Sequence, residues 1–159
     1  MVTVADARAA VAAVDDPELP VVTIDDLGIL RDVRMEDGRA VVSITPTYSG
    51  CPAMDEIRQD IHSRLAAIGV SEVEVRTELS PPWSTDLITS AGRAKLDAAG
   101  IAPPLPRDTD GPVAVRLSVR CPRCGSPDTE ELSRYSSTAC TSLWRCRDCR
   151  EPFDRIKEH

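Results

Sequence analysis

Cysteine side chains offer the clearest chemistry in this sequence, and five of the six fall in the last forty of its 159 residues. Four of them form two C-x-x-C pairs, Cys121–Cys124 and Cys146–Cys149, with twenty-one residues between the pairs. Each pair can hold a metal with two thiolates from a tight turn, and Gly125 supplies permissive backbone after the first pair. The spacing therefore predicts a tetrahedral four-sulfur site. Zinc suits four thiolates, and iron does as well, so the metal is left open between the two.

A fifth cysteine, Cys51, stands in Gly50-Cys51-Pro52, directly before a strongly periodic helical segment. Proline fits the first helical position, which puts Cys51 at or near the N-cap, where free N–H groups favour a thiolate. We therefore expect an accessible thiol with a pKa below the usual value of about 8.5. It is either a ligand for a transient iron ion or iron–sulfur cluster, or a buried structural cysteine. A catalytic Cys–His pair is disfavoured because His62 lies eleven residues further along the same helix.

The sixth cysteine, Cys140, precedes Cys146 by six residues. One interpretation is a small buried thiol. The other is an alternative ligand, or part of a second, exchangeable site shared with the rest of the chain. Several arginines surround the C-terminal cysteines and would either offset the charge of four thiolates or contact an acidic partner: Arg120, Arg123, Arg145, Arg147 and Arg150.

Composition narrows the class of protein. Hydrophobic residues make up 42% and charged residues 28% of the chain, which is typical of a globular protein. The net charge of −7 argues against nucleic acid as a partner. No apolar run is long enough for a membrane span, and the N-terminus lacks the basic region of a signal peptide, so we expect a cytoplasmic protein that does not bind membranes. No catalytic constellation is evident, and we expect a protein that is not an enzyme.

The elements that must position these residues fall into two domains. Residues 101–112 contain four prolines and predict a linker. Before it, residues 1–100 predict a small α/β domain in the order α-β-β-α-β-α. Its helices are expected near residues 4–14, 52–68 and 91–99, and its strands near 27–35, 39–45 and 72–79. The Asp37-Gly38 pair predicts a hairpin between the first two strands.

After the linker, residues 113–159 predict a zinc-ribbon-like β domain, so the fold class of the whole chain is α+β. Strands are expected near residues 113–120, 129–135 and 141–145. This segment has few large side chains and cannot bury a sufficient core without a metal.

Several segments resemble known families. DDPELPVVTIDDLGILRDV, TPTYSGCPA and SPPWSTDLIT resemble the SufT-like iron–sulfur assembly domain, and the C-terminal CPRCGSPDTEELSRYSSTACTSLWRCRDC resembles the PaaD (PaaJ) family of phenylacetate degradation. The resemblance implies a maturation factor for the multicomponent phenylacetyl-CoA epoxygenase, acting on the oxygenase or its iron–sulfur reductase. It implies iron or cluster loading through Cys51, with structural zinc in the ribbon. The alternative is a non-catalytic structural subunit of the oxygenase. A homodimer would cover the edges of so small a sheet.

The same resemblance implies roles for individual residues. Cys51 matches the Gly-Cys-Pro cysteine, and Cys140 matches a Ser-Thr-x-Cys element; both are candidate transfer ligands. The remaining matches are the ribbon ligands Cys121, Cys124, Cys146 and Cys149, and the candidate pocket residues Asp16, Glu18, Thr45, Thr47, Trp83, Thr85 and Asp86. Two positions depart from the family pattern: Ser136 stands where glycine is expected, and Thr141 where lysine is expected.

Overall fold

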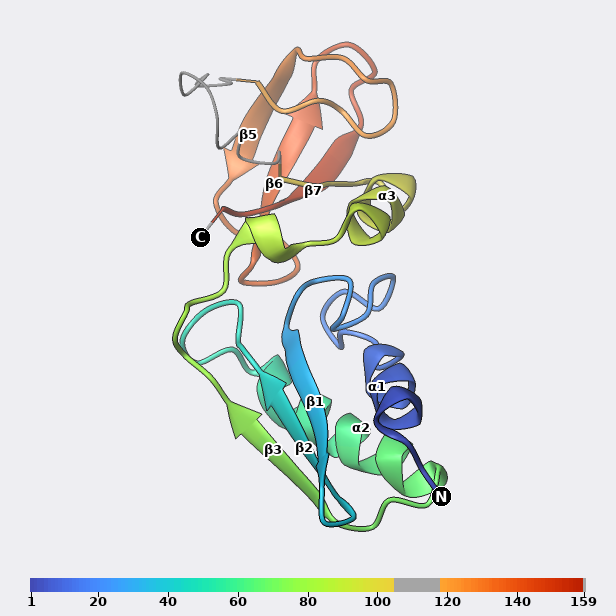
Figure 1. The fold of residues 1–159 in the computed structure, drawn as a ribbon. Helices are drawn as coiled ribbons and strands as arrows, with labels where there is room; N and C mark the ends of the chain where they lie inside the picture. Colours follow the sequence, from blue (N-terminus) through green and yellow to red (C-terminus); the bar gives the residue numbers. More distant parts are fainter. Residues whose placement is uncertain (105–117, 159) are drawn as a thin grey trace, which may run out of the picture. The chain divides into compact units, whose positions relative to one another are not determined.

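A computed structural model describes residues 1–104 and 118–158, shown as a ribbon in Figure 1. The described chain divides into two compact units, Met1–Gly92 and Arg93–Glu158. Helices and a three-stranded sheet build the first unit, and a four-stranded sheet builds most of the second. The α+β fold class expected from the sequence is confirmed. None of the described helices has the length and apolar character needed to cross a membrane.

The first unit is organised around a sheet of strands β1 (Leu30–Glu36), β2 (Arg39–Ile44) and β3 (Val73–Thr77), in the order β1-β2-β3. Strands β1 and β2 are antiparallel and meet at a two-residue turn in which Asp37 and Gly38 both have positive φ, 50° and 85°. A two-residue hairpin of this kind matches the twist of its strands, as the Asp-Gly pair predicted. Strand β3 runs parallel to β2, so helix α2 (Ala53–Ala67) makes the crossover between them.

Helices α1 (Val4–Ala12) and α2 lie on the same face of this sheet (Figure 1). Helix α1 begins with a capping box, in which Thr3 and Asp6 satisfy each other's backbone N–H groups. The apolar stripe of α2 is fully buried against the sheet, including Ile57, Ile61 and Leu65. Burying these side chains is what fixes α2, and with it the loop that carries Cys51 just before the helix begins.

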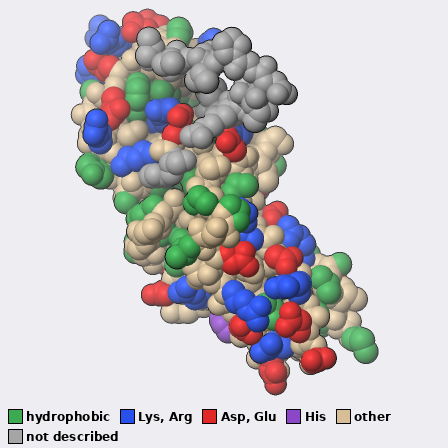
Figure 2. Space-filling model, turned by 60° about the vertical axis from the view of Figure 1, so that its left-hand side comes forward, with side chains coloured by type: hydrophobic (Ala, Val, Ile, Leu, Met, Phe, Trp, Pro, Cys, Tyr) green, Lys and Arg blue, Asp and Glu red, His purple; other side chains and the backbone are tan. Residues whose placement is uncertain are grey.

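The other face of the sheet is covered by charged side chains. Arg34 on β1, Val41 on β2 and Glu74 on β3 lie opposite one another in the register and therefore share this face. Charges on this face are paired: Arg39 of β2 and Arg76 of β3 both contact Glu74 of β3, at 3.0 and 2.7 Å. Figure 2 shows basic and acidic side chains interspersed in this way on the surface. These pairs lie over Val41, which is 1% exposed, so no helix is needed on this side.

The chain after β3 returns to the turn before β1 and packs tightly against it. The indole of Trp83 donates to the carbonyl of Leu27 at 2.7 Å, and the N–H of Thr89 donates to the carbonyl of Asp26 at 2.9 Å. A Cβ at Gly92 would lie only 2.7 Å from the Asp26 carbonyl oxygen. Glycine is therefore required at this close approach, in helix α3 (Ser90–Ala98), which follows the short 3₁₀ helix η1 (Thr85–Leu87).

The second unit contains strands β4 (Ile101–Ala102), β5 (Thr129–Ser133), β6 (Thr141–Cys146) and β7 (Pro152–Ile156), in the order β4-β7-β6-β5. Its small core combines two cysteines with apolar side chains: Ala102, Cys121, Cys146 and Phe153 are all buried, with Val119 and Trp144 packed against them. Strands β5 and β6 match the sequence prediction. Strand β7 was not predicted, because Glu-Pro-Phe-Asp-Arg-Ile lacks a clear two-residue alternation.

The boundary between the units differs from the expected one. The linker was placed at residues 101–112, but Ile101 and Ala102 pair with β7, and Ala102 is only 3% exposed. A proline-rich segment can still supply an edge strand before its first proline, because edge pairing needs few backbone donors. Residues 105–112 of the expected linker, and residues 113–117 of the strand expected after it, lie outside the described residues. Residues 118–120 are described and are not in a strand.

Candidate functional site

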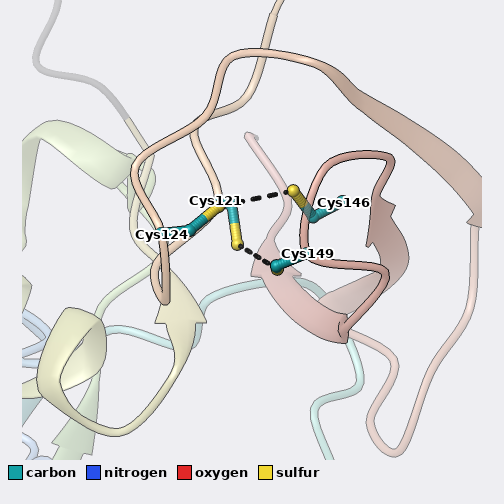
Figure 3. Close-up of side chains that lie close together, drawn as sticks. All are labelled: Cys121, Cys124, Cys146 and Cys149. Carbon is teal, nitrogen blue, oxygen red and sulfur yellow. Dashed lines mark hydrogen bonds between the residues drawn. The ribbon is translucent and has the colours of Figure 1, made fainter.

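Four cysteines of the second unit converge on one point. The Sγ atoms of Cys121, Cys124, Cys146 and Cys149 all lie within 4.8 Å of one another. Figure 3 shows the first two on one loop and the last two on another, with Cys121 facing Cys149 at 3.8 Å and Cys124 facing Cys146 at 3.5 Å. A tetrahedral zinc ion with Zn–S bonds of about 2.3 Å requires S···S separations of about 3.8 Å. The donor set and its spacing therefore fit one tetrahedral ion.

The backbone explains why the sulfurs meet. Each C-x-x-C pair sits in a loop closed by the same hydrogen bond: the N–H of Cys121 donates to Ser126 O at 2.9 Å, and that of Cys146 to Glu151 O at 3.0 Å. After each pair the chain takes a left-handed residue, Gly125 with φ 75° and Arg150 with φ 63°. The two loops are thus built alike, which orients two thiols from each toward a common centre.

Backbone N–H groups and neighbouring thiols shift the pKa values of the clustered cysteines in opposite directions. The N–H of Cys149, followed by that of Asp148, lowers the pKa of Cys146 to about 7 despite its burial. The N–H of Glu151 acts in the same direction on Cys149, but reduced hydration of its sulfur and the three adjacent thiols outweigh it and raise the pKa of this exposed cysteine to about 12. Four thiols this close cannot all ionise without a cation between them, and a divalent ion would supply that charge.

Cys51 lies in the first unit, in the loop between β2 and α2, and it is half-buried. Its thiol accepts from the N–H of Ala53 and interacts with the side chain of Thr47. Glu18 and Asp16 are close enough to act on it electrostatically. The structure therefore brings three other predicted residues, Asp16, Glu18 and Thr47, together around the Cys51 thiol, from two segments about thirty residues apart.

The expected low pKa of Cys51 is wrong. Burial raises the pKa of this thiol above its ordinary value, and the carboxylates of Glu18 and Asp16 raise it further. The helix does contribute in the predicted direction, through the Ala53 N–H, but the N-cap is Pro52 and not Cys51. One N–H at the edge of a helix cannot outweigh desolvation together with two nearby negative charges.

Asp16 is held in place by its own turn. Its Oδ1 accepts the N–H groups of Glu18 at 2.9 Å and Leu19 at 2.8 Å, which orders the Asp-Pro-Glu segment as the sequence suggested. The side chain is 5% exposed, and burial raises the pKa of its carboxyl despite these two donors. Glu56, in the first turn of α2, adds to this rise. Glu56 was missed from the sequence; its only signal was an acidic residue five positions after Cys51.

The other candidate pocket residues are distributed differently. Thr45 is 1% exposed, and its Oγ1 has no hydrogen-bond partner among the described residues. Trp83 directs its indole N–H to Leu27, and Thr85 is buried at the start of η1. Asp86 is exposed. The segment that holds Trp83, Thr85 and Asp86 therefore serves at least in part to secure the turn before β1.

Cys140 is buried at the beginning of β6, at 8% exposure. Its Sγ lies 3.1 Å from the hydroxyl of Thr138, and its carbonyl accepts the N–H of Lys157 at 2.9 Å. It is not among the four clustered cysteines, so the structure does not make it an alternative ligand of that cluster. Its surroundings within the second unit are those of a packed thiol.

Both parts of the chain match known protein families. The profile of the iron–sulfur cluster assembly protein family matches residues 5–76, and that of the PaaD zinc beta ribbon domain matches residues 106–157. A protein of Escherichia coli strain K12, named as a putative subunit of 1,2-phenylacetyl-CoA epoxidase, is 42% identical over 149 residues, which cover 94% of this chain and 89% of that protein.

The first part of the chain also has relatives of its own. A Porphyromonas gingivalis protein named Fe-S protein maturation auxiliary factor is 32% identical over 83 residues, 51% of this chain and 78% of that protein. A solved structure of a domain of unknown function from Bacillus anthracis superposes with a TM-score of 0.55 at 33% identity, covering 58% of this chain and 90% of that one. Together these matches show that the chain belongs to the PaaD family, which joins an iron–sulfur cluster assembly domain to a C-terminal zinc β ribbon.

Proposed function

We propose that this protein is a maturation factor for a phenylacetyl-CoA epoxidase, and that it delivers iron, as an ion or within an iron–sulfur cluster, through Cys51. The observation that carries the proposal is the convergence of Asp16, Glu18 and Thr47 on the Cys51 thiol. A role in phenylacetate metabolism is supported by the relative named as an epoxidase subunit. The iron–sulfur role is supported by relatives named as maturation auxiliary factors, and those names favour a protein that is not itself an enzyme.

The chemistry of the site suits transient binding of a cation. A thiol next to two carboxylates stays protonated while it is empty, because ionisation would place three negative charges together. An arriving iron ion reverses that balance, since it favours the thiolate and the carboxylates alike. Such a site binds its cargo only as the thiol loses its proton. Reprotonation then assists release to a recipient, which a permanent four-thiolate site does not allow.

We assign a different role to the ribbon. Zinc held by Cys121, Cys124, Cys146 and Cys149 would tie the two loops together and supply the stability that the small core of the second unit lacks. Support comes from the sulfur spacing and from the match to a zinc ribbon family. On this proposal the ribbon metal is structural and remains bound while Cys51 binds and releases iron.

The test is the metal content of the recipient. Oxygenase and reductase components purified anaerobically from cells lacking this protein should contain less iron, and Cys51→Ser should reproduce that loss. His62→Asn, on the exposed side of α2, is the matched control and should behave as wild type. Adding the purified protein to iron-replete components should leave their turnover unchanged.

A second candidate function, a structural subunit of the oxygenase, is favoured by the name of the Escherichia coli relative. It predicts the opposite result in the last experiment. If iron-replete components remain inactive until this protein is added in stoichiometric amounts, it is a subunit and the maturation role fails.

A further inference from the structure

A basic cavity lies beside the four-cysteine cluster and has no role in the function proposed above. Its volume is about 330 Å³, and the described residues that line it are Arg145, Cys146, Arg147 and Arg150. The other three clustered cysteines do not line it, so it is a separate space that shares one wall with the metal centre. Three guanidinium groups around one hollow would attract an anion.

Two of these arginines are already arranged around a carboxylate. Glu130 on β5 accepts from Arg145 at 2.5 Å and from Arg147 at 3.1 Å. The shared carboxylate holds both side chains in place, and Asp128 also contacts Arg147, at 3.7 Å. These two acids balance the charges of Arg145 and Arg147, so the surplus positive charge at the cavity is that of Arg150.

Of the three arginines that line the cavity, Arg150 says most about what the cavity is for. Its φ of 63° is left-handed, a conformation that the other loop gives to Gly125. Within the part of the chain that the structure describes, no ion pair or hydrogen bond holds its side chain. Glycine would serve the turn better, so the guanidinium is not needed for folding. The left-handed turn belongs to the cysteine loop, whereas the exposed side chain of Arg150 at the cavity is not explained by that turn.

We propose that this cavity is a docking site for an acidic segment of a partner protein, with an Asp or Glu side chain entering between Arg147 and Arg150. Charge complementarity selects the occupant, and Glu130 shows that Arg145 and Arg147 of this cavity hold a carboxylate between them. A carboxylate side chain is favoured over a nucleic-acid phosphate because the anion that Arg145 and Arg147 already bind is the carboxylate of Glu130. This inference does not depend on iron delivery by Cys51.

The left-handed turn at Arg150 allows the guanidinium to be removed without destabilising the loop. In Arg150→Gly the guanidinium is removed and the turn receives the residue that it prefers, so the melting temperature should be unchanged or higher. Binding of a fluorescein-labelled hexaglutamate peptide to zinc-loaded full-length protein is measured by fluorescence anisotropy at low salt. We expect Arg150→Gly to weaken binding by about tenfold, the usual effect of losing one charge-assisted hydrogen bond. Arg134→Gly, which removes an exposed arginine that does not line the cavity, should change it little.

Three outcomes would overturn the proposal. Equal binding by Arg150→Gly and wild type would mean that the peptide binds elsewhere. Displacement of the peptide by sodium phosphate, at concentrations where sodium chloride of equal ionic strength has no effect, would make the cavity a phosphate site. Tighter binding of a fluorescein-labelled single-stranded oligonucleotide than of the peptide would assign the surface to nucleic acid. Cys51→Ser should bind the peptide as wild type does, so failure of the iron proposal leaves this result intact.

Discussion

At the scale of single residues, the Cys51 thiol has the least predictable chemistry in the protein. Its position before a helix favours the thiolate, whereas burial and the charges of Glu18 and Asp16 favour the thiol, and the second set prevails. The pKa is therefore raised above that of an ordinary thiol. The direction of this pKa shift matters for function, because an empty site whose thiol keeps its proton resists oxidation and stray alkylation.

Alkylation of Cys51 by iodoacetamide should accordingly reach half of its maximal rate only above about pH 8.5, the usual midpoint of a free thiol, as followed by mass spectrometry of its peptide. Glu18→Gln removes one of the two nearby charges, so it should lower the pKa and speed alkylation at fixed pH. Glu72→Gln, which neutralises an exposed acid in the same unit, is the control and should have no effect. A Cys51 profile that reaches half its maximum below pH 8.5 would contradict this account.

At the scale of local elements, the Asp16 turn links stability to pH. The folded-state pKa of Asp16 is raised from 3.8, chiefly by burial. Its protonated form is therefore favoured by folding: this contribution to stability is fully present below pH 3.8 and is lost as the pH rises through the folded pKa. At neutral pH the ionised side chain remains because its oxygen satisfies two backbone N–H groups.

Two substitutions separate charge from hydrogen bonding at this turn. Asp16→Asn keeps an acceptor oxygen and removes the charge, so the melting temperature at pH 7 should be equal to or above that of wild type. Its advantage should shrink as the pH is lowered toward 4. Asp16→Ala leaves both N–H groups without their acceptor and should destabilise the first unit by about 1–3 kcal/mol. If the asparagine variant is as unstable as the alanine variant at pH 7, the carboxylate charge itself is required.

At the scale of the whole molecule, the two units rest on different sources of stability. The first buries long aliphatic side chains between α2 and its sheet, including Ile57, Ile61 and Leu65. The core of the second is small and includes two of the clustered cysteines. Metal binding by four thiolates contributes about 10–16 kcal/mol of apparent free energy at neutral pH in small zinc domains.

Cys149→Ser should therefore unfold the second unit and leave the first folded. Amide spectra should retain dispersed signals from residues 1–92 and lose those from residues 118–158, and the bound zinc should be lost. Cys140→Ser, the same substitution at a cysteine of the same unit outside the cluster, should keep both. An ordered second unit without metal would show that its apolar core suffices.

Much of this protein follows from local sequence alone. The capping pair Thr3 and Asp6 starts α1, the Asp37-Gly38 turn sets the first hairpin, and the periodic apolar stripe defines α2. The two C-x-x-C pairs likewise determine the four-cysteine cluster, because their spacing fixes a loop that directs two thiols the same way. The cap, the turn, the helix and the geometry within each C-x-x-C pair depend on contacts within a few residues, which the sequence displays directly.

Tertiary structure decided the rest. Strand β4 exists only because Ile101 and Ala102 find the edge of β7, a pairing across fifty residues that no local pattern records. The raised pKa of Cys51 depends on Glu18 and Asp16 approaching from a distant turn. The basic cavity brings Arg145 and Arg147 together with Arg150, whose left-handed conformation its residue type disfavours. Electrostatics and edge pairing act through space, so their outcome is determined by which segments the folded chain brings together and not by residue type.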